Sequence, residues 1–563
     1  MSSPAAATVS TAIADLVITG GLVVDGSGAP GYIADVAITG QRISAIGPDL
    51  SGHRVLDASG HVVAPGFIDN HTHYDAQVFW DPDLTPSSYH GVTTVIAGNC
   101  GFTLAPCHPD DREVIVHTLE KVEDMDVAAL TAGVPWDFET FPEYLESIDR
   151  RGTLLNYGAY VGHTAVRLYV MGDEAFEREA TAQEIESMRD VVRDAMDRGA
   201  MGFATSYAVT HVDAHGRKIP SRHAAQGEIE AIADVLGEMG LGVAQIAFGE
   251  FGIRAIYALQ ARINRPITYG ALLTTPDDRS RKTVAIHNAE RAKGSQVWPQ
   301  VSPRPLVLQV NMASPFTFNV VPAFAELLNG TDAERRAAYS DPQWRALAYD
   351  QLCNASLAPR WASFTVGESM AHADLIGTKI SDLSAASGES PLDVMIRLSL
   401  DDDLTTRFRV VLLNDDEPHV AELLNTEGTI LGLSDAGAHV GQLCDACAPT
   451  DLLGGWVRDR QAITLEKAVR KLSGEQADML GLADRGYVRV GAFADIAVFD
   501  PATVAPGPVR RVRDFPADSE RLTADQPVGM RHVLVNGTPI RVDGEMVEAV
   551  RTGRPGQMVR PAR

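Results

Sequence analysis

The stretch Pro65-Gly66-Phe67-Ile68-Asp69-Asn70-His71-Thr72-His73 ends an apolar segment, residues 62–68, that predicts a short buried strand. Side chains at positions i and i+2 of a strand point to the same side, so His71 and His73 can converge on one point. Two neutral imidazoles at this spacing suit a borderline divalent ion such as zinc. Two strand-end histidines satisfied by protein partners are the structural alternative. The Pro-Gly turn and the apolar strand favour the metal interpretation, because a β/α barrel carries its first catalytic residues at this place.

The composition indicates a folded protein with one large catalytic domain and a smaller one. The chain has 563 residues, of which 45% are hydrophobic, and a net charge of −26. This charge argues against nucleic acid or an anionic membrane as a partner, since both need clustered positive charge. No signal peptide is expected, and no apolar stretch has the roughly 20 residues that a transmembrane helix needs. Five cysteines do not suggest a disulfide framework, so a cytoplasmic location is expected.

The two ends of the chain resemble each other in their pattern. Residues 1–12 are small and polar and are expected to be disordered, whereas 13–63 and 485–550 hold short alternating strands with Gly and Asp between them. This pattern is typical of antiparallel sheets, and we expect both ends to fold together as one small β-sandwich. The last residues, 551–563, contain four arginines among Gly and Pro. We expect a flexible tail or a subunit contact there.

The middle of the chain, residues 64–484, alternates between strand-like and helical segments. Helices are expected at 184–198 and 227–239, among others. Such alternation predicts parallel strands with crossover helices, here a (β/α)8 barrel of the TIM type. The eight predicted strands are 62–68, 93–97, 155–161, 201–205, 242–247, 266–273, 409–413 and 429–433. Residues 317–400 are helical and are interpreted as an insertion, either a lid or a purely structural element.

Several short motifs resemble the amidohydrolase superfamily and, within it, the N-acyl-D-amino-acid deacylases. They cover the chain from about residue 13 to 545. The motifs are Gly66-Phe67-Ile68-Asp69-Asn70-His71-Thr72-His73, Gly98-Asn99-Cys100-Gly101-Phe102, Val161-Gly162-His163, Gly202-Phe203-Ala204-Thr205-Ser206, Ser434-Asp435-Ala436 and Gly491-Ala492-Phe493-Ala494-Asp495. The resemblance implies hydrolysis of a C–N bond with one or two divalent ions, zinc first. A bound ion lowers the pKa of a water and polarises the scissile carbonyl.

The same resemblance implies roles for two further residues. Asp435 follows an apolar strand, and the matching aspartate of the family contributes to the metal site and moves the proton from the attacking water to the leaving nitrogen. A turn or helix cap is the structural alternative for Asp435. Cys100 lies between glycines, and the family uses the matching thiolate as a zinc ligand. A buried free thiol is the alternative.

This sequence departs from the deacylase pattern at the fifth and sixth strands. The deacylases carry a histidine at the end of each, whereas segments 243–250 and 266–273 contain none, and the family's substrate-binding lysine has no match. The metal ligands predicted here are His71, His73, Cys100 and Asp435. Other side chains that can complete or support the site are His163, His211, His439 and Glu250.

Three further features bear on the pocket. His163 or Tyr207 is predicted to help stabilise the developing oxyanion, and Arg222 to bind a substrate carboxylate through a bidentate bond. A solvated loop arginine is the alternative for Arg222. The pair Cys444 and Cys447 forms a C-x-x-C without a second pair at matching spacing, and two ordinary thiols are favoured over a redox or zinc motif.

The sequence thus predicts a metal-dependent hydrolase of a non-peptide amide bond, with an N-acyl-(D-)amino acid as the best substrate. A cyclic amide, carbamate or lactone is the alternative substrate, and a metal-free scaffold protein of the same fold is the alternative class. The expected partners are a small-molecule substrate and, for assembly, further copies of the same chain.

Overall fold

The computed structural model describes residues 13–213, 216–277, 279–315, 318–327, 330–355 and 358–562. The predicted disorder of residues 1–12 lies outside these ranges. The chain divides into two compact units, which are described separately. The first consists of Met1–Arg304, Glu417–Val440 and Cys444–Arg563, and the second of Pro305–Asp416 and Gly441–Leu443.

A parallel barrel forms the centre of the first unit. In the described residues it has eight strands, with β8 and β9 counted as one interrupted strand. The strands are β6 Phe67–Asp69, β7 Val92–Ala97, β8 Asn156–Ala159, β9 Val161–Gly162, β10 Gly202–Ser206, β11 Val243–Ala247, β12 Ile267–Gly270, β13 Val297–Val301 and β17 Ile430–Leu431. The amide of Asn70, directly after β6, donates to the Leu431 carbonyl of β17 at 2.6 Å and joins the first strand to the last. The predicted barrel is therefore present.

One predicted barrel strand is wrong, and one barrel strand was missed. Residues 409–413 belong to β16, Arg407–Leu413, which pairs with antiparallel neighbours in the second unit. The seventh barrel strand is β13, whose sequence contains Pro299 and the polar Gln300. A proline in a strand removes a backbone donor and argues against a central position, which explains the error. The polar Gln300 is fully buried in the barrel.

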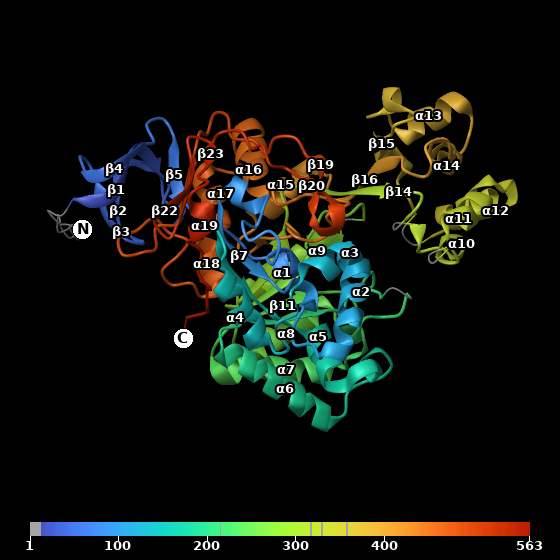
Figure 1. Cartoon of the computed structure of the whole chain (residues 1–563), viewed down its shortest axis with the longest axis horizontal. Coiled ribbons are helices and arrows are strands. Elements are labelled where there is room, and N and C mark those ends of the chain that lie inside the picture. The colour runs from blue at the N-terminus through green and yellow to red at the C-terminus, as the bar shows by residue number, and fades with distance from the viewer. Residues whose placement is uncertain are drawn as a thin grey trace. The chain divides into compact units, whose positions relative to one another are not determined.

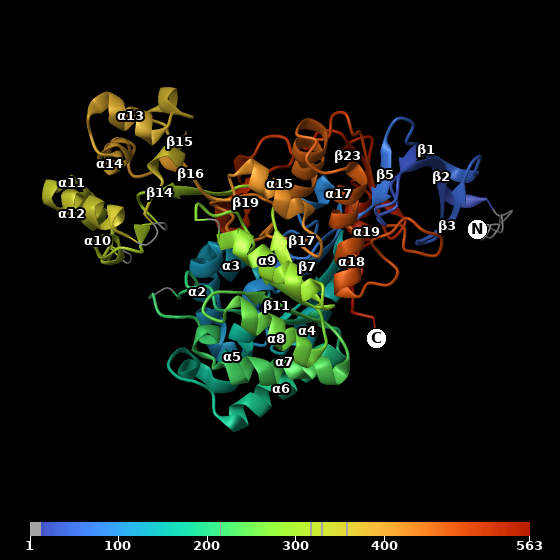
Figure 2. The ribbon, with the colours of Figure 1, turned by 180° about the vertical axis from the view of Figure 1, so that it is seen from behind.

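Helices cover the barrel, and α4 to α8 lie around β11 in both views (Figures 1 and 2). The predicted helices at 184–198 and 227–239 correspond to α6 and α7. The Thr181 side chain and Glu184 form a capping box at the start of α6, a known start signal. None of the helices in the described part of the chain is long and apolar enough to cross a membrane. The helices of this unit are α1 Tyr74–Gln77, α2 Arg112–Glu123, α3 Val127–Gly133, α4 Phe141–Arg151, α5 His163–Met171, α6 Ala182–Asp197, α7 Gln226–Met239, α8 Ile253–Ile263, α9 Arg279–Arg291, α15 Glu417–Asn425, α16 Ala448–Asp451, α17 Leu465–Leu472, α18 Gly474–Leu480 and α19 Val550–Gly553.

Both chain ends contribute strands to one sheet. Nine of the described strands form it, and its centre is the antiparallel pair of β5, from the N-terminal part, and β18, from the C-terminal part. Ile18 and Val36 from one end pack with Ile496 and Leu534 from the other in a shared apolar core. The strands are β1 Ala14–Val23, β2 Tyr32–Thr39, β3 Arg42–Gly47, β4 Gly52–Asp57, β5 Val62–Pro65, β18 Ile496–Phe499, β21 Met530–Val535, β22 Thr538–Val542 and β23 Glu545–Met546, and a separate hairpin is formed by β19 Arg510–Phe515 and β20 Ser519–Thr523.

The C-terminal segment is ordered against the barrel, and the prediction of a flexible tail is wrong for its described part, 551–562. The Gln557 carbonyl accepts a hydrogen bond from the Tyr157 backbone of β8 at 3.0 Å, and the Val559 backbone donates to the Tyr157 carbonyl at 2.8 Å. Val559 is buried. The prediction relied on the arginine-rich composition of the segment and gave no weight to the apolar Val559. The backbone pairing with Tyr157 leaves no pattern in the side chains.

The second unit is a mixed α/β body inserted between β13 and β17. Its three strands are antiparallel in the order β14-β16-β15, and Phe318, Phe324, Phe364 and Phe408 contribute to its own apolar core. The sequence predicts a helical insertion at 317–400, whereas this unit begins at Pro305 and also contains strands. Its elements are β14 Leu306–Asn311, α10 Pro322–Ala325, α11 Asp332–Ser340, α12 Pro342–Cys353, β15 Phe364–Glu368, α13 Ile380–Ser387, α14 Pro391–Asp401 and β16 Arg407–Leu413.

Gly66 marks the point where the chain leaves the composite sheet and enters the barrel. The predicted strand at 62–68 is split there into β5 and β6, and the Gly66 backbone donates to the Asp495 carbonyl at 2.8 Å. A Cβ on Gly66 would lie 2.2–2.7 Å from three side-chain atoms of Thr93. This contact requires a glycine in front of the His71 strand.

We expect Gly66→Ala to lower the free energy of unfolding by about 1–3 kcal/mol, as is usual for overpacking a core. Chemical denaturation monitored by circular dichroism measures this change. Gly47→Ala is the matched control, because a Cβ on Gly47 meets nothing within 4 Å. Equal stability of the two variants would contradict the prediction.

Candidate metal centre

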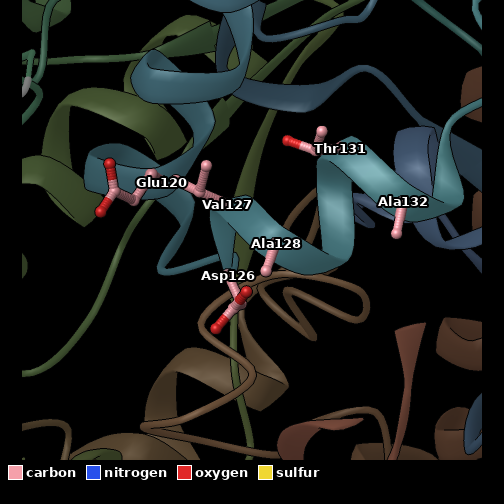
Figure 3. Close-up of a pocket in the computed structure, with 6 residues that line it drawn as sticks. All are labelled: Glu120, Asp126, Val127, Ala128, Thr131 and Ala132. Atoms are coloured by element: carbon pink, nitrogen blue, oxygen red, sulfur yellow. The ribbon is translucent and has the colours of Figure 1, made fainter. Parts of the chain in front are cut away.

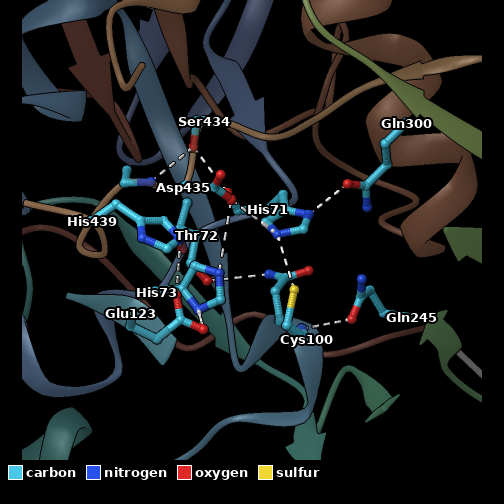
Figure 4. Close-up of polar contacts among 12 residues, drawn as sticks. His71, Thr72, His73, Cys100, Glu123, Gln245, Gln300, Ser434, Asp435 and His439 are labelled. Atoms are coloured by element: carbon cyan, nitrogen blue, oxygen red, sulfur yellow. Dashed lines mark hydrogen bonds and ion pairs between the residues drawn. The ribbon is translucent and has the colours of Figure 1, made fainter. Parts of the chain in front are cut away.

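Four predicted ligands converge at the carboxyl ends of barrel strands. His71 and His73 follow β6, Cys100 follows β7 and Asp435 follows β17. The Nε2 atom of His71 is 3.1 Å from Asp435 Oδ1 and 3.6 Å from Cys100 Sγ, and His73 Nε2 is 3.8 Å from the same Asp435 oxygen. Figure 4 shows these side chains turned toward one another. Cys100 and Asp435 adopt left-handed φ angles of 55° and 46°, a backbone state that is uncommon outside functional sites and turns.

The separations between these atoms fit a bound divalent ion. In a tetrahedral zinc site, bonds of about 2.0–2.3 Å place two ligand atoms about 3.3–3.8 Å apart. The ligand atoms of His71, His73 and Cys100 all lie within 4.8 Å of one another, which makes them the one such group in the described part of the chain. Side-chain exposure is 2% for His71 and 16% for Asp435. The centre is therefore largely shielded from solvent but remains accessible on the side of Asp435.

Gln300 holds His71 in the tautomer that a metal ligand needs. The Nε2 group of Gln300 donates to Asn70 Oδ1 at 3.3 Å and to Thr268 Oγ1 at 3.1 Å, so its Oε1 is the atom that faces His71 Nδ1 at 2.5 Å. An oxygen acceptor at this place requires a proton on Nδ1, which leaves the lone pair of Nε2 for an ion.

Glu123 lies beside His73 on the opposite side of the centre. This carboxylate, at the end of α2, is buried, and its oxygens lie 3.5 Å from His73 Nδ1 and 3.7 Å from His439 Nε2. Asp124 ends the helix in a left-handed conformation with φ of 50°. Glu123 thus lies close to both imidazoles without a hydrogen bond, and His73 Nδ1 has no hydrogen-bond partner among the described residues.

The centre is strongly polarised. Burial opposes the charge of His71, but Cys100 and Asp435 outweigh it and raise the pKa of His71 well above its ordinary value. Burial and then His71 lower the pKa of His73. Burial likewise opposes ionisation of Asp435, but His71 holds the pKa of this carboxyl below its usual range. The positive charge of His71 therefore balances the negative charge of Asp435. A bound divalent ion would take over this role.

Two residues predicted to act in catalysis do not face this centre. His163 is fully buried, and its Nδ1 and Nε2 pair with Thr205 Oγ1 at 2.8 Å and Glu228 Oε1 at 2.9 Å. The hydroxyl of Tyr207 donates to the Ala224 carbonyl at 2.5 Å. Both side chains are thus engaged by the barrel wall. We correct their prediction as oxyanion-stabilising residues to structural ones.

His211 and Arg222 lie on the loop after β10 and approach the same mouth. His211 Nδ1 pairs with Ser206 Oγ at 2.7 Å, and burial, followed by the charges of His439 and Arg222, lowers the pKa of His211 to about 3. Arg222 donates to the His211 and Val209 carbonyls at 3.2 and 3.1 Å. Its Nη2 is 3.6 Å from Glu250. Glu250 is therefore a partner of Arg222 and takes no part in the cluster of ligands.

The C-x-x-C motif lies apart from the ligand group. Cys447 Sγ donates to the Cys444 carbonyl at 3.2 Å, and both thiols are free and buried. A separate surface hollow at α2 and α3 (Figure 3) is lined by Glu120, Asp126, Val127, Ala128, Thr131 and Ala132. Asp126 already caps α3 through the Ala129 backbone, and neither a histidine nor a cysteine lines this hollow.

Sequence reasoning missed Gln300 and Glu123 and left Gln245 without a role. Gln300 was missed with its strand, because Pro299 argued against a strand there. Glu123 ends an amphipathic helix, where an acidic residue is ordinary, so the sequence carries no signal for it. Gln245 is the inward residue of β11 and accepts the Cys100 backbone N–H at 2.8 Å.

Comparison with known proteins identifies the family. A model described as "Amidohydrolase family" matches residues 54–541. The chain belongs to this family. D-aminoacylase of Alcaligenes xylosoxydans xylosoxydans is 30% identical over 93% of this chain and 94% of its own. A structure described for the binuclear metal centre of D-aminoacylase has a TM-score of 0.67 and 28% identity, covering 97% of this chain and 99% of that one.

A second solved relative of this amidohydrolase carries an ion and an inhibitor. It is the N-acyl-D-glutamate deacylase from Bordetella bronchiseptica, in complex with zinc and a phosphonate that mimics the tetrahedral intermediate. Its TM-score is 0.66 and its identity 26%, covering 98% of this chain and all of that one. The predicted superfamily, barrel fold and enzyme class are confirmed: the protein is a metal-dependent hydrolase of carbon–nitrogen bonds other than peptide bonds.

Proposed function

We propose that this amidohydrolase cleaves the acyl–nitrogen bond of an N-acylated D-amino acid and releases a carboxylic acid and the free amino acid. The observation that carries the proposal is the convergence of His71, His73, Cys100 and Asp435 at one end of the barrel. The similarity to D-aminoacylase over most of both chains supports the choice of substrate class.

The residues of the centre suit a divalent ion. His71 and His73 would bind it through Nε2, Cys100 through its thiolate and Asp435 through a carboxylate oxygen, a mixed N, S and O set that suits zinc. A bound ion there would make a water nucleophilic near neutral pH and polarise the scissile carbonyl. Gln300 would keep the His71 imidazole in the required orientation.

Asp435 is the proton carrier in this proposal. Its side chain is partly exposed at the mouth, 3.1 Å from His71 Nε2, where a carboxylate can accept a proton from the attacking water. The same carboxyl then donates that proton to the leaving nitrogen, which departs as a neutral amine. The left-handed backbone of Asp435 turns this side chain from the strand end toward the two histidines.

Arg222 is proposed to bind the substrate carboxylate. Its guanidinium is largely buried, and its Nε has no partner among the described residues. The contact with the half-exposed Glu250 is long, at 3.6 Å, so a substrate carboxylate can compete for the cation. A planar guanidinium suits a carboxylate geometrically. A homo-oligomeric assembly and a cytoplasmic location remain predictions from the sequence.

The test compares substrates. With N-acetyl-D-leucine and N-acetyl-D-glutamate, we expect release of free amine at a kcat/KM at least about tenfold above that of the L enantiomers, a difference of about 1.4 kcal/mol. N-acetylisoamylamine, which is N-acetylleucine without its carboxylate, is the matched control and should react more slowly than N-acetyl-D-leucine. Turnover of cyclic amides, with none of any N-acyl amino acid, would contradict the proposal and support the alternative substrate.

A further inference from the structure

Gln245 presents an unused hydrogen-bond donor beside the metal centre. It lies in the middle of β11, in register with Ala204 and Thr268, and is fully buried. Its Oε1 accepts the backbone N–H of Cys100 at 2.8 Å. Because the Cys100 N–H can only donate, the atom that faces it must be the oxygen. The nitrogen Nε2 is therefore the free end, and it has no partner among the described residues.

Such a free donor needs an explanation. A buried polar group without a partner costs about 1–3 kcal/mol, and native proteins rarely leave one unused. Gln245 contacts one of the predicted ligands directly, through the backbone of Cys100. The Sγ atom of Cys100 is 3.6 Å from His71 Nε2. Figure 4 shows the amide end of Gln245 beside Cys100.

The neighbouring strand adds no ligand to the centre. β12 ends at Gly270, where a Cβ would already lie 3.2 Å from Gln300 Oε1 and 3.5 Å from His71 Cε1. A side chain at Gly270 would press on Gln300 and on the His71 ring that Gln300 orients. The fifth and sixth strands thus contribute an amide and a glycine. The ligand group of the described residues consists of His71, His73 and Cys100, with Asp435 in contact.

We infer that this centre holds a single divalent ion and that Gln245 supplies, through Nε2, a hydrogen bond to the oxygen of the scissile carbonyl. The inference rests on the proposed function. One ion would be sufficient for His71, His73, Cys100 and Asp435, and a catalytic ion would keep a further position for the attacking water. A preorganised amide donor stabilises the charge that develops on the carbonyl oxygen without a second cation.

The test uses two variants of the full-length holoenzyme. Gln245→Glu keeps an acceptor for the Cys100 N–H and loses the amide donor, whereas Gln245→Met loses both. We expect one zinc per chain in the wild type and in Gln245→Glu, measured by elemental analysis. We also expect kcat for N-acetyl-D-leucine to fall by about 10²- to 10³-fold in both variants, as for loss of an oxyanion donor, with KM changed less.

Binding of an N-phosphonate analogue of the substrate supplies a readout apart from turnover, and its Kd should rise by a similar factor. Gln260→Glu, in α8, is the matched control and should leave kcat and metal content unchanged. Two ions per wild-type chain, or a kcat within twofold of wild type in Gln245→Glu, would overturn the inference. A wild-type enzyme with one ion and no activity on N-acyl amino acids would instead overturn the proposed function.

Discussion

Asp435→Asn is expected to lower kcat by about 10²- to 10⁴-fold, the usual contribution of a general acid–base residue. The carboxylate lies 3.1 Å from His71 Nε2 and 3.8 Å from His73 Nε2, at the place where an attacking water must lose its proton. An asparagine of the same shape can still offer an oxygen to the ion but cannot accept and return a proton. Steady-state kinetics with N-acetyl-D-leucine and elemental analysis measure turnover and metal content together.

The control for Asp435 is Asp484→Asn. Asp484 is a half-exposed partner of Arg42 in the first unit, so its replacement should leave kcat unchanged. A turnover in Asp435→Asn that matches the wild type, with the ion still bound, would remove Asp435 from the proton-transfer role. Loss of the ion together with activity would show that Asp435 acts mainly as a ligand.

Removal of the metal should lower kcat at least as much as Asp435→Asn does. Dialysis against a chelator is expected to lower kcat by about 10³-fold or more, because an ion supplies several kcal/mol of charge stabilisation. Addition of zinc, cobalt or manganese should restore activity. His71→Ala should resist this restoration, since it removes the imidazole nearest to both Asp435 and Cys100.

A spectroscopic signal separates metal binding from catalysis in this experiment. The cobalt-loaded protein should show thiolate-to-cobalt absorption that disappears in Cys100→Ser. His117→Ala is the control, because it changes an exposed histidine that pairs with Glu120. This variant should keep both the absorption and the kcat of the wild type. Full activity of a protein that has been shown to be metal-free would contradict the proposed hydrolase mechanism.

The barrel and the first two ligands follow from local sequence. His71 and His73 can be recognised because a strand repeats its side-chain direction every second residue, and this periodicity needs no tertiary information. The same holds for the helix at α6, whose Thr181 and Glu184 form a capping box. Cys100 and Asp435 also follow strand-like segments, but their roles are implied by the resemblance of their short motifs to those of the family.

The errors come from segments where local pattern and tertiary position disagree. The sequence of β13 is unfavourable for a strand because it contains Pro299, yet β13 is a strand of the barrel. The sequence of β16 is favourable for a strand, but β16 belongs to the second unit. His163 has the sequence context of a site residue, but Thr205 and Glu228 occupy both of its nitrogens. Sequence alone cannot show which partner a buried histidine will meet.

The superfamily, the barrel and the four candidate ligands can be recognised in the sequence, because periodicity and short motifs are local properties of the chain. The surroundings of those ligands depend on the tertiary fold. Gln300, Glu123 and Gln245 come from a strand, a helix end and another strand that are far apart in sequence, and polar contacts across the barrel bring them to His71, His73 and Cys100. Such contacts require closure of the barrel, which places residues from distant segments at one mouth.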